Sequence, residues 1–189
     1  MIDYRILADS VDHYRSRGYQ PIETSWWVTE NVKDITKPDG KFVEDYQVSV
    51  NKKYLVASGE QSYLYMMAKG MLVPGKYQTI TPCFRNEVQD VIHRKHFMKN
   101  ELIYAYCDDP EEMHKMMASA SAFFGQYLST RTVKKEPQDD VTAVCYDIET
   151  LSGVELGSYG IRRYGPFKWV FGTGVAEPRL SLAIAMQKD

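Results

Sequence analysis

Residues 81–101 read TPCFRNEVQDVIHRKHFMKNE, and this stretch decides the fold that the sequence predicts. Arg85 and Glu87 stand two positions apart directly after an aromatic residue, and a charged turn follows them. Because strand side chains alternate between the two faces, these two residues are expected to point the same way. Phe97 and Glu101 would likewise share a face on the returning strand, with Lys99 between them. The stretch therefore predicts a β-hairpin with charged and aromatic groups collected on one face.

Such a face has two interpretations. A guanidinium can hold a phosphate through paired hydrogen bonds, and an aromatic ring can stack on a base, so the hairpin would suit a nucleotide. The alternative is an ordinary amphipathic hairpin whose charged face is solvated. The hairpin alone does not decide between them.

Composition restricts the class of protein. The 189 residues are 44% hydrophobic and 25% charged, which is enough to bury the core of one globular domain. A net charge of −2 gives no overall basic signal for nucleic acid. Cys83, Cys107 and Cys145 are far apart, which favours reduced thiols in a cytoplasmic protein. No apolar run is long enough for a membrane span, and no secretion signal is visible.

Local patterns predict the remaining elements. The apolar spacing of residues 4–14 predicts a helix, and residues 19–30 read as a strand. Ser58 and Gln61 have capping-box spacing and open a helix to about residue 69, while Asp109 caps another. The remaining expectations are a turn over 36–41, strands over 44–49, 53–57, 141–149, 154–161 and 169–171, an exposed loop over 130–140, and a buried helix over 180–186.

This order of elements favours one α+β domain over residues 1–189. Hairpins and short connections indicate an antiparallel sheet flanked by helices rather than alternating βαβ units. The stretch Gly172-Thr173-Gly174 lacks the third glycine and the acidic residue of a dinucleotide fingerprint.

Several separated segments resemble the signature motifs of class II aminoacyl-tRNA synthetases. The hairpin resembles motif 2, in which Phe84, Arg85, Glu87, His93 and Phe97 match the family pattern. The segment FGTGVAEPRLSLAI, residues 171–184, resembles motif 3, and Arg179 falls on its arginine. The opening helix and strand, through GYQPIETS, resemble motif 1, which builds the family's dimer interface.

A fourth segment is closer to one branch of the family. Residues 155–162, ELGSYGIR, resemble the metal and substrate segment of the aspartyl and asparaginyl synthetases. They resemble the corresponding segment of ammonia-dependent asparagine synthetase, which uses no tRNA, even more closely. The four matches span almost the whole chain in the family's order, so the resemblance implies a class II catalytic core.

The resemblance implies activation of an amino acid by ATP through an acyl-adenylate. Arg85 would hold the α-phosphate and the substrate carboxylate, and Glu87 would receive the adenine amino group. Phe97 would stack on adenine, while His93 and Arg179 would meet the γ-phosphate. Arg179 would also cover the other face of the adenine. Arg85 and Arg179 are thus the expected catalytic residues, because cations already in place stabilise charge that develops at phosphorus.

Magnesium and the amino acid are the other implied ligands. Glu155 and Ser158 occupy the family's metal-ligand positions, with Glu149 or Asp147 as the second carboxylate. The alternative for these acids is solvated strand charge. Arg162 matches the arginine that reads an acidic or amide substrate, although a surface ion pair would also explain it.

Two further residues are candidates for binding the substrate. Gln61 is expected to face the amino group of the amino acid, although its capping position alone also explains it. Glu60 has the same two interpretations, substrate binding or a structural role.

The chain departs from the family pattern at identifiable positions. Ser25 stands where motif 1 has a proline, and Pro21 comes earlier than expected. In motif 3, Ala176 replaces a glycine and Pro178 replaces an acid, so the backbone is expected to approach ATP differently. No anticodon-binding module is recognisable, which leaves the acyl acceptor open among tRNA, ammonia, a carrier protein and a small molecule.

Three hypotheses follow. The first is a minimal ATP-dependent ligase that acts as a cytoplasmic homodimer. The second is a non-catalytic paralogue that binds nucleotide or regulates another protein. The third is an α+β domain unrelated to ATP.

Overall fold

The computed structural model of the chain describes residues 1–36, 46–48, 52–86 and 88–187. Its elements in chain order are α1 (Tyr4–Arg15), β1 (Gln20–Pro21), β2 (Trp27–Thr29), α2 (Glu30–Lys33), β3 (Gln47–Val48), β4 (Lys53–Leu55), α3 (Gly59–Ala68), β5 (Gly75–Phe84), β6 (His96–Ala105), α4 (Pro110–Phe124), β7 (Thr130–Lys135), β8 (Thr142–Thr150), β9 (Glu155–Tyr164), β10 (Phe167–Glu177) and α5 (Arg179–Met186).

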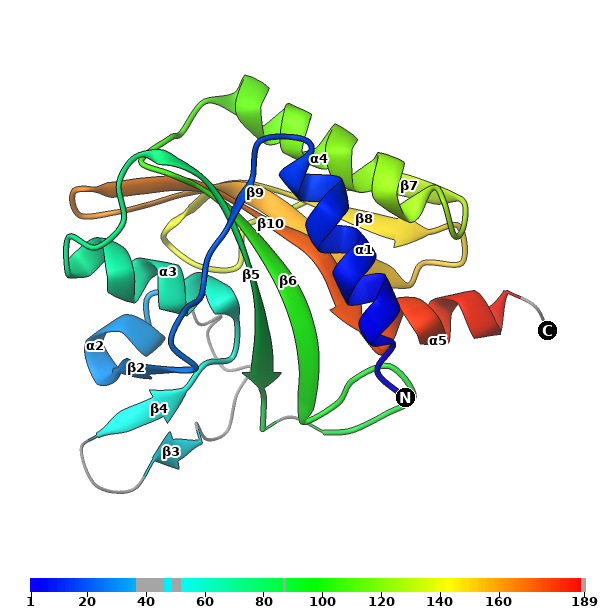
Figure 1. Cartoon of the computed structure of the whole chain (residues 1–189), viewed down its shortest axis with the longest axis horizontal. Coiled ribbons are helices and arrows are strands. Elements are labelled where there is room, and N and C mark those ends of the chain that lie inside the picture. Colours follow the sequence, from blue (N-terminus) through cyan, green and yellow to red (C-terminus); the bar gives the residue numbers. More distant parts are fainter. Residues whose placement is uncertain (37–45, 49–51, 87, 188–189) are drawn as a thin grey trace.

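A large sheet organises these elements (Figure 1). It has seven strands in the order β1-β5-β6-β10-β9-β8-β7, and only the β1–β5 pair is parallel. A smaller sheet has the order β2-β4-β3. The predicted class, α+β with an antiparallel sheet flanked by helices, is therefore confirmed.

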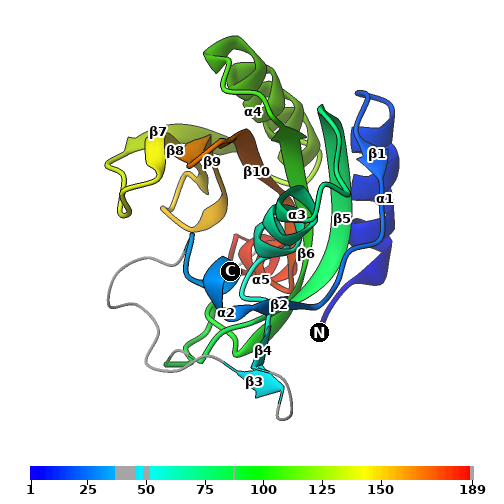
Figure 2. The same cartoon turned by 90° about the vertical axis from the view of Figure 1, so that its left-hand side faces the viewer.

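Helices cover both faces of the large sheet, as Figures 1 and 2 show. α1, α4 and α5 pack on one face, and α3 packs on β5 and β6 from the other. Neighbouring strand residues divide between the two cores because their side chains point in opposite directions. Leu102 and Val170 belong to the core under α1 and α4, whereas Ile103 and Trp169 belong to the core under α3.

The central hairpin has the predicted register. Phe97, Lys99 and Glu101 share the face of β6 on which α3 begins, each facing a β5 residue across the ladder. α3 approaches this face closely at Gly59, where a Cβ atom would lie 2.7 Å from Thr81 Oγ1. A glycine is therefore required at the start of α3.

A bulge interrupts the central strand β10. Its pairing with β6 shifts between Thr173 and Val175, so Gly174 has no partner in that ladder. The Tyr14 hydroxyl of α1 donates to the Gly174 carbonyl at 2.9 Å. A Cβ on Gly174 would meet the Tyr14 ring at 2.9 Å, so the bulge lies against α1. α5 begins two residues after β10, with Arg179.

Local signals placed the helix ends correctly. Gly18, which follows α1, has φ of +88°, a conformation that favours glycine. Asp109 caps α4, and its carboxylate accepts from the backbone N–H of Glu111 at 2.8 Å. Ser58 caps α3 by accepting from the N–H of Glu60.

Some element predictions were wrong. Residues 130–140 are not one loop, because 130–135 form the edge strand β7. Residues 19–30 contain two strands, β1 and β2, which belong to different sheets. The strand expected over 169–171 extends from Phe167 to Glu177. Only Leu180 and Ala183 of α5 are buried, so this helix is not the buried element expected.

Two predictions fall wholly or partly outside the described residues. Of the turn expected over 36–41, only Thr36 is described. Of the strand expected over 44–49, the described residues are 46–48, which include β3. Within the described ranges, no helix combines the length and apolar content needed to cross a bilayer.

Candidate active site

A cavity of about 510 Å³ opens on the face of the large sheet that carries α3. Segments far apart in the chain line it: the start of α3, the β5–β6 hairpin, the β7–β8 connection, β8, β9, β10 and the start of α5. The predicted site residues that line it are Glu60, Gln61, Arg85, His93, Glu155, Ser158, Arg162 and Arg179. Glu87 lies outside the described residues, and neither Phe97 nor Glu149 is part of the cavity wall.

Arg85 follows β5 directly and lies beside Phe97. Its backbone N–H donates to the Lys95 carbonyl at 2.8 Å, which continues the hairpin by one residue pair. The side-chain Nε donates to the Ala57 carbonyl at 3.1 Å. The guanidinium carbon lies 5.0 Å from the centre of the Phe97 ring, a cation–π distance. The structure thus places Arg85 and Phe97 side by side, with Arg85 in the cavity wall and Phe97 behind it.

Arg179 reaches the same cavity from the first turn of α5. Its Nη1 lies 3.2 Å from Glu155 Oε1, and the side chain is only 16% exposed. Arg85 follows β5 and Arg179 follows β10, the two strands that flank β6, and both arginines line this cavity. An anion lying in the cavity would therefore have two guanidinium groups within its walls.

Arg162 has partners on three sides. Its Nη1 donates to Glu60 Oε2 at 2.5 Å, and its Nη2 donates to Asp139 Oδ2 at 3.1 Å. Its Nε donates to Thr142 Oγ1 at 2.8 Å, and the Phe171 ring lies 4.1 Å from the guanidinium carbon. The structure therefore replaces the surface ion pair considered above with a nearly buried network.

The two acids of β8, Asp147 and Glu149, differ in their surroundings. Asp147 is 7% exposed, and burial together with the Glu155 charge raises the pKa of its carboxyl to about 6. Glu149 instead accepts from Lys135 at 2.7 Å and from Arg131 at 3.2 Å, which holds its pKa below the usual value. Of the two acids proposed as the second metal ligand, Asp147 is the one that lines the cavity.

The helix-start residues have structural partners. Gln61 Oε1 accepts from the Ala57 N–H at 2.8 Å, and its Nε2 donates to the Lys33 carbonyl at 2.7 Å. The first bond holds the residue before the Ser58 cap rather than the cap itself, and the second ties α3 to α2, so the reciprocal bond of a capping box is not formed. Glu60 is 4% exposed and accepts from the Trp169 indole at 2.6 Å as well as from Arg162.

His93 lies in the exposed turn of the hairpin. Its Nδ1 is 2.6 Å from Asp90 Oδ2. Hydrogen bonds from the His93 backbone and ring lower the pKa of Asp90 to about 2. His93 is therefore held by its own turn, although it still reaches the cavity wall.

Sequence reasoning missed two features of the cavity. Asp139 was placed in an exposed loop, yet it faces Arg162; nothing in its sequence neighbourhood signals a partner 23 positions later. Glu101 was recognised only as part of the hairpin face. It is 1% exposed, pairs with Lys99 at 2.8 Å and accepts from the Ser58 hydroxyl at 2.5 Å.

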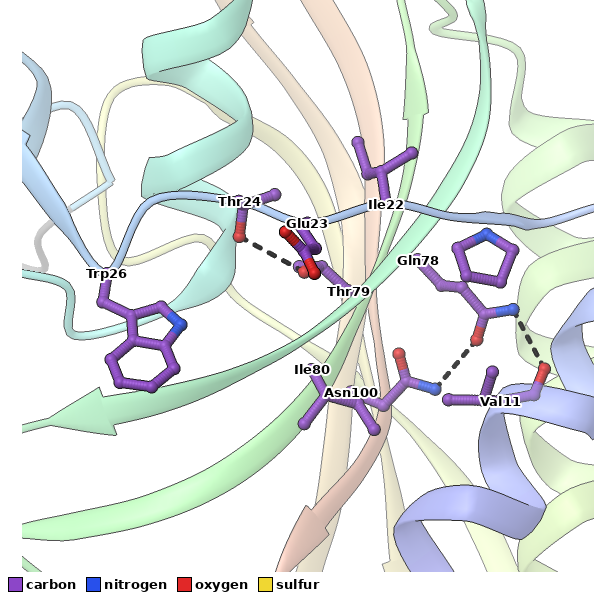
Figure 3. Close-up of a pocket in the computed structure, with 10 residues that line it drawn as sticks. Val11, Ile22, Glu23, Thr24, Trp26, Gln78, Thr79, Ile80 and Asn100 are labelled. Carbon is purple, nitrogen blue, oxygen red and sulfur yellow. Dashed lines mark hydrogen bonds between the residues drawn. The ribbon is translucent and has the colours of Figure 1, made fainter.

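A second cavity, of about 590 Å³, lies at the free edge of β5 where β1 ends (Figure 3). Val11, Ile22, Trp26 and Ile80 supply apolar walls. Figure 3 shows Asn100 donating toward Gln78, which in turn donates to the Val11 carbonyl, at 3.0 Å each. This cavity adjoins the segment that resembles motif 1.

The sequence and the structure were compared with known proteins. No protein-family model matches the sequence. A serine–tRNA ligase from Methanosphaera stadtmanae is 24% identical over 165 residues, which cover 78% of this chain and 39% of the relative. The chain therefore spans well under half of that relative's length.

Solved structures agree over nearly the whole chain. The cytoplasmic serine–tRNA ligase of Naegleria fowleri, in complex with AMP, has a TM-score of 0.77 at 22% identity over 95% of this chain and 52% of its own. The seryl-tRNA synthetase of Pyrococcus horikoshii, complexed with ATP, gives 0.75 at 21% identity over 93% of this chain and 48% of its own. A pyrrolysyl-tRNA synthetase from Desulfitobacterium hafniense gives 0.76 at 15% identity over 97% of this chain and 69% of its own. The chain has the fold of the class II aminoacyl-tRNA synthetase catalytic core.

Proposed function

We propose that this chain is an ATP-dependent ligase that activates an amino acid as its adenylate. A carboxylate oxygen of the amino acid attacks the α-phosphorus of ATP, the bond to the bridging oxygen breaks, and pyrophosphate leaves. The observation that carries the proposal is the convergence of Arg85 and Arg179 on one cavity. Serine–tRNA ligase structures of the same fold were solved with AMP and with ATP, which supports a nucleotide in this cavity.

In this proposal each arginine has a distinct role. Arg85 holds the α-phosphate and the substrate carboxylate and stabilises the negative charge that develops during attack. Arg179 leaves Glu155 for the γ-phosphate and the outer face of adenine. Phe97 stacks on adenine once the Arg85 guanidinium has turned from its ring to the phosphate, and His93 contacts the γ-phosphate. Glu87 would receive the adenine amino group.

Magnesium fits the acids of this cavity. Asp147 and Glu155 are close enough for the charge of one to raise the pKa of the other, and a divalent cation would relieve this repulsion. Ser158 adds a hydroxyl oxygen at the same wall. Within the described ranges, no group of three or more His, Cys, Asp or Glu residues is arranged to hold a metal alone. Asp147, Glu155 and Ser158 would thus share the ion with ATP, whose phosphate charge it would neutralise.

Exchange of pyrophosphate into ATP, measured with each of the twenty amino acids, tests this function. Exchange that depends on one amino acid is the expected result. Arg85→Ala and Arg179→Ala should each lower the rate on the order of 100-fold, because each removes a cation that stabilises the transition state. Arg15→Ala, at an exposed arginine paired with Asp12 on α1, is the matched control and should leave the rate unchanged.

A non-catalytic nucleotide-binding paralogue is the second candidate. It is favoured by the contact of Arg179 with Glu155 and by Ala176 and Pro178, which replace motif 3 residues. Tight ATP binding without exchange for any amino acid would favour this candidate. If ATP also failed to raise the melting temperature, neither nucleotide proposal would stand, since a ligand of the folded state must stabilise it.

The acidic or amide amino acid suggested by Arg162 has no support from the relatives found, which are seryl and pyrrolysyl enzymes. An amide remains compatible with the cavity, whereas a free acid would meet a guanidinium already paired with Glu60 and Asp139. The acceptor of the activated amino acid stays open among tRNA, ammonia, a carrier protein and a small molecule.

We also propose a cytoplasmic homodimer that forms through the motif 1 segment. Support comes from the apolar second cavity and from Trp26, which is 56% exposed at its wall. Light scattering after gel filtration should give twice the chain mass. Trp26→Glu should yield monomers, while Val91→Glu, at an exposed valine of the hairpin turn, should not. A wild-type monomer at micromolar concentration would rule this assembly out.

A further inference from the structure

In the proposed site Arg162 faces the side chain of the amino acid, and two carboxylates already outweigh its positive charge. Two carboxylates, from Glu60 and Asp139, contact the guanidinium at 2.5 and 3.1 Å. The Arg162 and Glu60 side chains are only 13% and 6% exposed, so water screens these charges weakly. With one positive and two negative groups, the cluster has a formal charge of −1.

Neither acid is free to turn away. Glu60 also accepts from the Trp169 indole at 2.6 Å, inside the core under α3. Asp139 Oδ1 accepts from the backbone N–H groups of Val141 and Thr142 at 3.1 and 2.7 Å, which fixes the start of β8. Moving Glu60 would leave the buried Trp169 N–H without an acceptor, and moving Asp139 would do the same to two partly buried backbone N–H groups, which is costly.

We infer that Glu60 and Asp139 determine amino-acid specificity by excluding side chains that carry a carboxylate, so that the substrate has an uncharged or cationic side chain. This inference rests on the proposed function. A substrate carboxylate would be the third negative group on one guanidinium, and like charges brought together in a weakly screened site repel strongly. A side chain of the same shape without the negative charge escapes this repulsion.

Pairs of amino acids with side chains of the same shape, one a carboxylate and one an amide, distinguish the effect of substrate charge from that of substrate size. Pyrophosphate exchange is measured with aspartate against asparagine and with glutamate against glutamine, within the panel of twenty amino acids. The amide is expected to exceed the acid in each pair, and neither acid is expected to be the best substrate. Asp139→Asn removes one negative charge and keeps a carbonyl oxygen for the Val141 and Thr142 N–H groups. The kcat/KM of each acid relative to its amide should then rise roughly tenfold or more.

Asp140→Asn is the matched control. Asp140 is the exposed neighbour of Asp139, and its substitution changes the net charge by the same amount. It should leave the acid-to-amide ratio unchanged. Glu60→Gln repeats the test from α3 if Asp139→Asn does not fold, with folding checked by melting temperature.

The outcomes separate the inference from the function. Robust exchange that is best with aspartate or glutamate would overturn the inference and leave the proposed function standing. An unchanged ratio in a folded Asp139→Asn protein would do the same. Absence of exchange with every amino acid would overturn both.

Discussion

Replacing Glu60 with alanine is expected to destabilise the fold by about 3–5 kcal/mol, although Glu60 belongs to the proposed site. The carboxylate accepts from Arg162 at 2.5 Å and from the Trp169 indole at 2.6 Å. A buried Trp169 N–H without an acceptor costs about 1–3 kcal/mol. Removing one partner of a buried ion pair costs about 3–5 kcal/mol, and because Asp139 still neutralises Arg162, we expect about 2 kcal/mol here.

The loss is large against the roughly 5–15 kcal/mol that stabilises a typical domain. Urea unfolding followed by circular dichroism measures it, and the melting temperature should fall by roughly 6–20 °C. Glu60→Gln is the matched variant: it keeps an oxygen for Trp169, so we expect a loss of only about 1–2 kcal/mol.

A double-mutant cycle isolates the indole contact. Trp169→Phe removes the N–H, and its coupling to Glu60→Ala should be about 1 kcal/mol or more. If Glu60→Ala costs less than about 1 kcal/mol, or no more than Glu60→Gln, the network does not hold the fold as described.

Three further predictions concern other parts of the molecule. Gly160→Ala should cost about 1–3 kcal/mol in urea unfolding, because its Cβ would collide with the Val144 carbonyl; a neutral result would contradict the strand spacing. Asp147 has a raised pKa, so its ionisation costs stability progressively as the pH rises from the unfolded value of 3.8 to about 6, and the cost is fully present above pH 6. In buffer with EDTA, Asp147→Asn should therefore stabilise the protein by about 1–2 kcal/mol at pH 8, discounted for solvent screening, and by little at pH 4; a gain independent of pH would refute the assignment. Asp109→Ala should cost about 1 kcal/mol through loss of the α4 cap, whereas Asp109→Asn should keep most of it, and equal losses would exclude the cap.

The hairpin could be predicted because local rules and burial agree there. The charged turn within residues 81–101 separates two strands of equal length, along which side chains alternate between the two faces. Phe97 and Glu101 share a face in the structure as the period requires. Helix ends at Gly18 and Asp109 were equally accessible, because a single residue type sets each of them.

Local sequence patterns mispredicted the edge strand β7 and the central strand β10, for different reasons. β7 contains Arg131, Lys134 and Lys135, so its composition is that of a loop; an edge strand tolerates such charges because one side faces water. β10 continues past two glycines that would usually end a strand. At Gly172 the strand packs closely against α4, where a Cβ atom would lie 2.5 Å from Met116 Sδ, so glycine is the residue that fits.

The cavity could be predicted only where motifs mark it. Arg85 and Arg179 were predicted because each falls on the arginine of a family motif, but the partners of Arg162 were not predicted. Contacts between Asp139, Glu60 and Arg162 depend on which hairpins meet across the sheet. These contacts form only in the tertiary structure, and no local sequence pattern predicts them.

The extra residue in β10 determines which way the end of that strand faces. Side chains alternate along a strand, so one added position reverses the orientation of every later side chain. Deleting Gly174 would straighten the ladder with β6 and turn residues 175–177 over, carrying the first turn of α5 with them. The guanidinium of Arg179 would then leave the face of the sheet that carries the cavity of about 510 Å³. The geometry of the proposed active site therefore depends on one glycine that has no partner in the β6 ladder and is held by a tyrosine on the opposite side of the sheet.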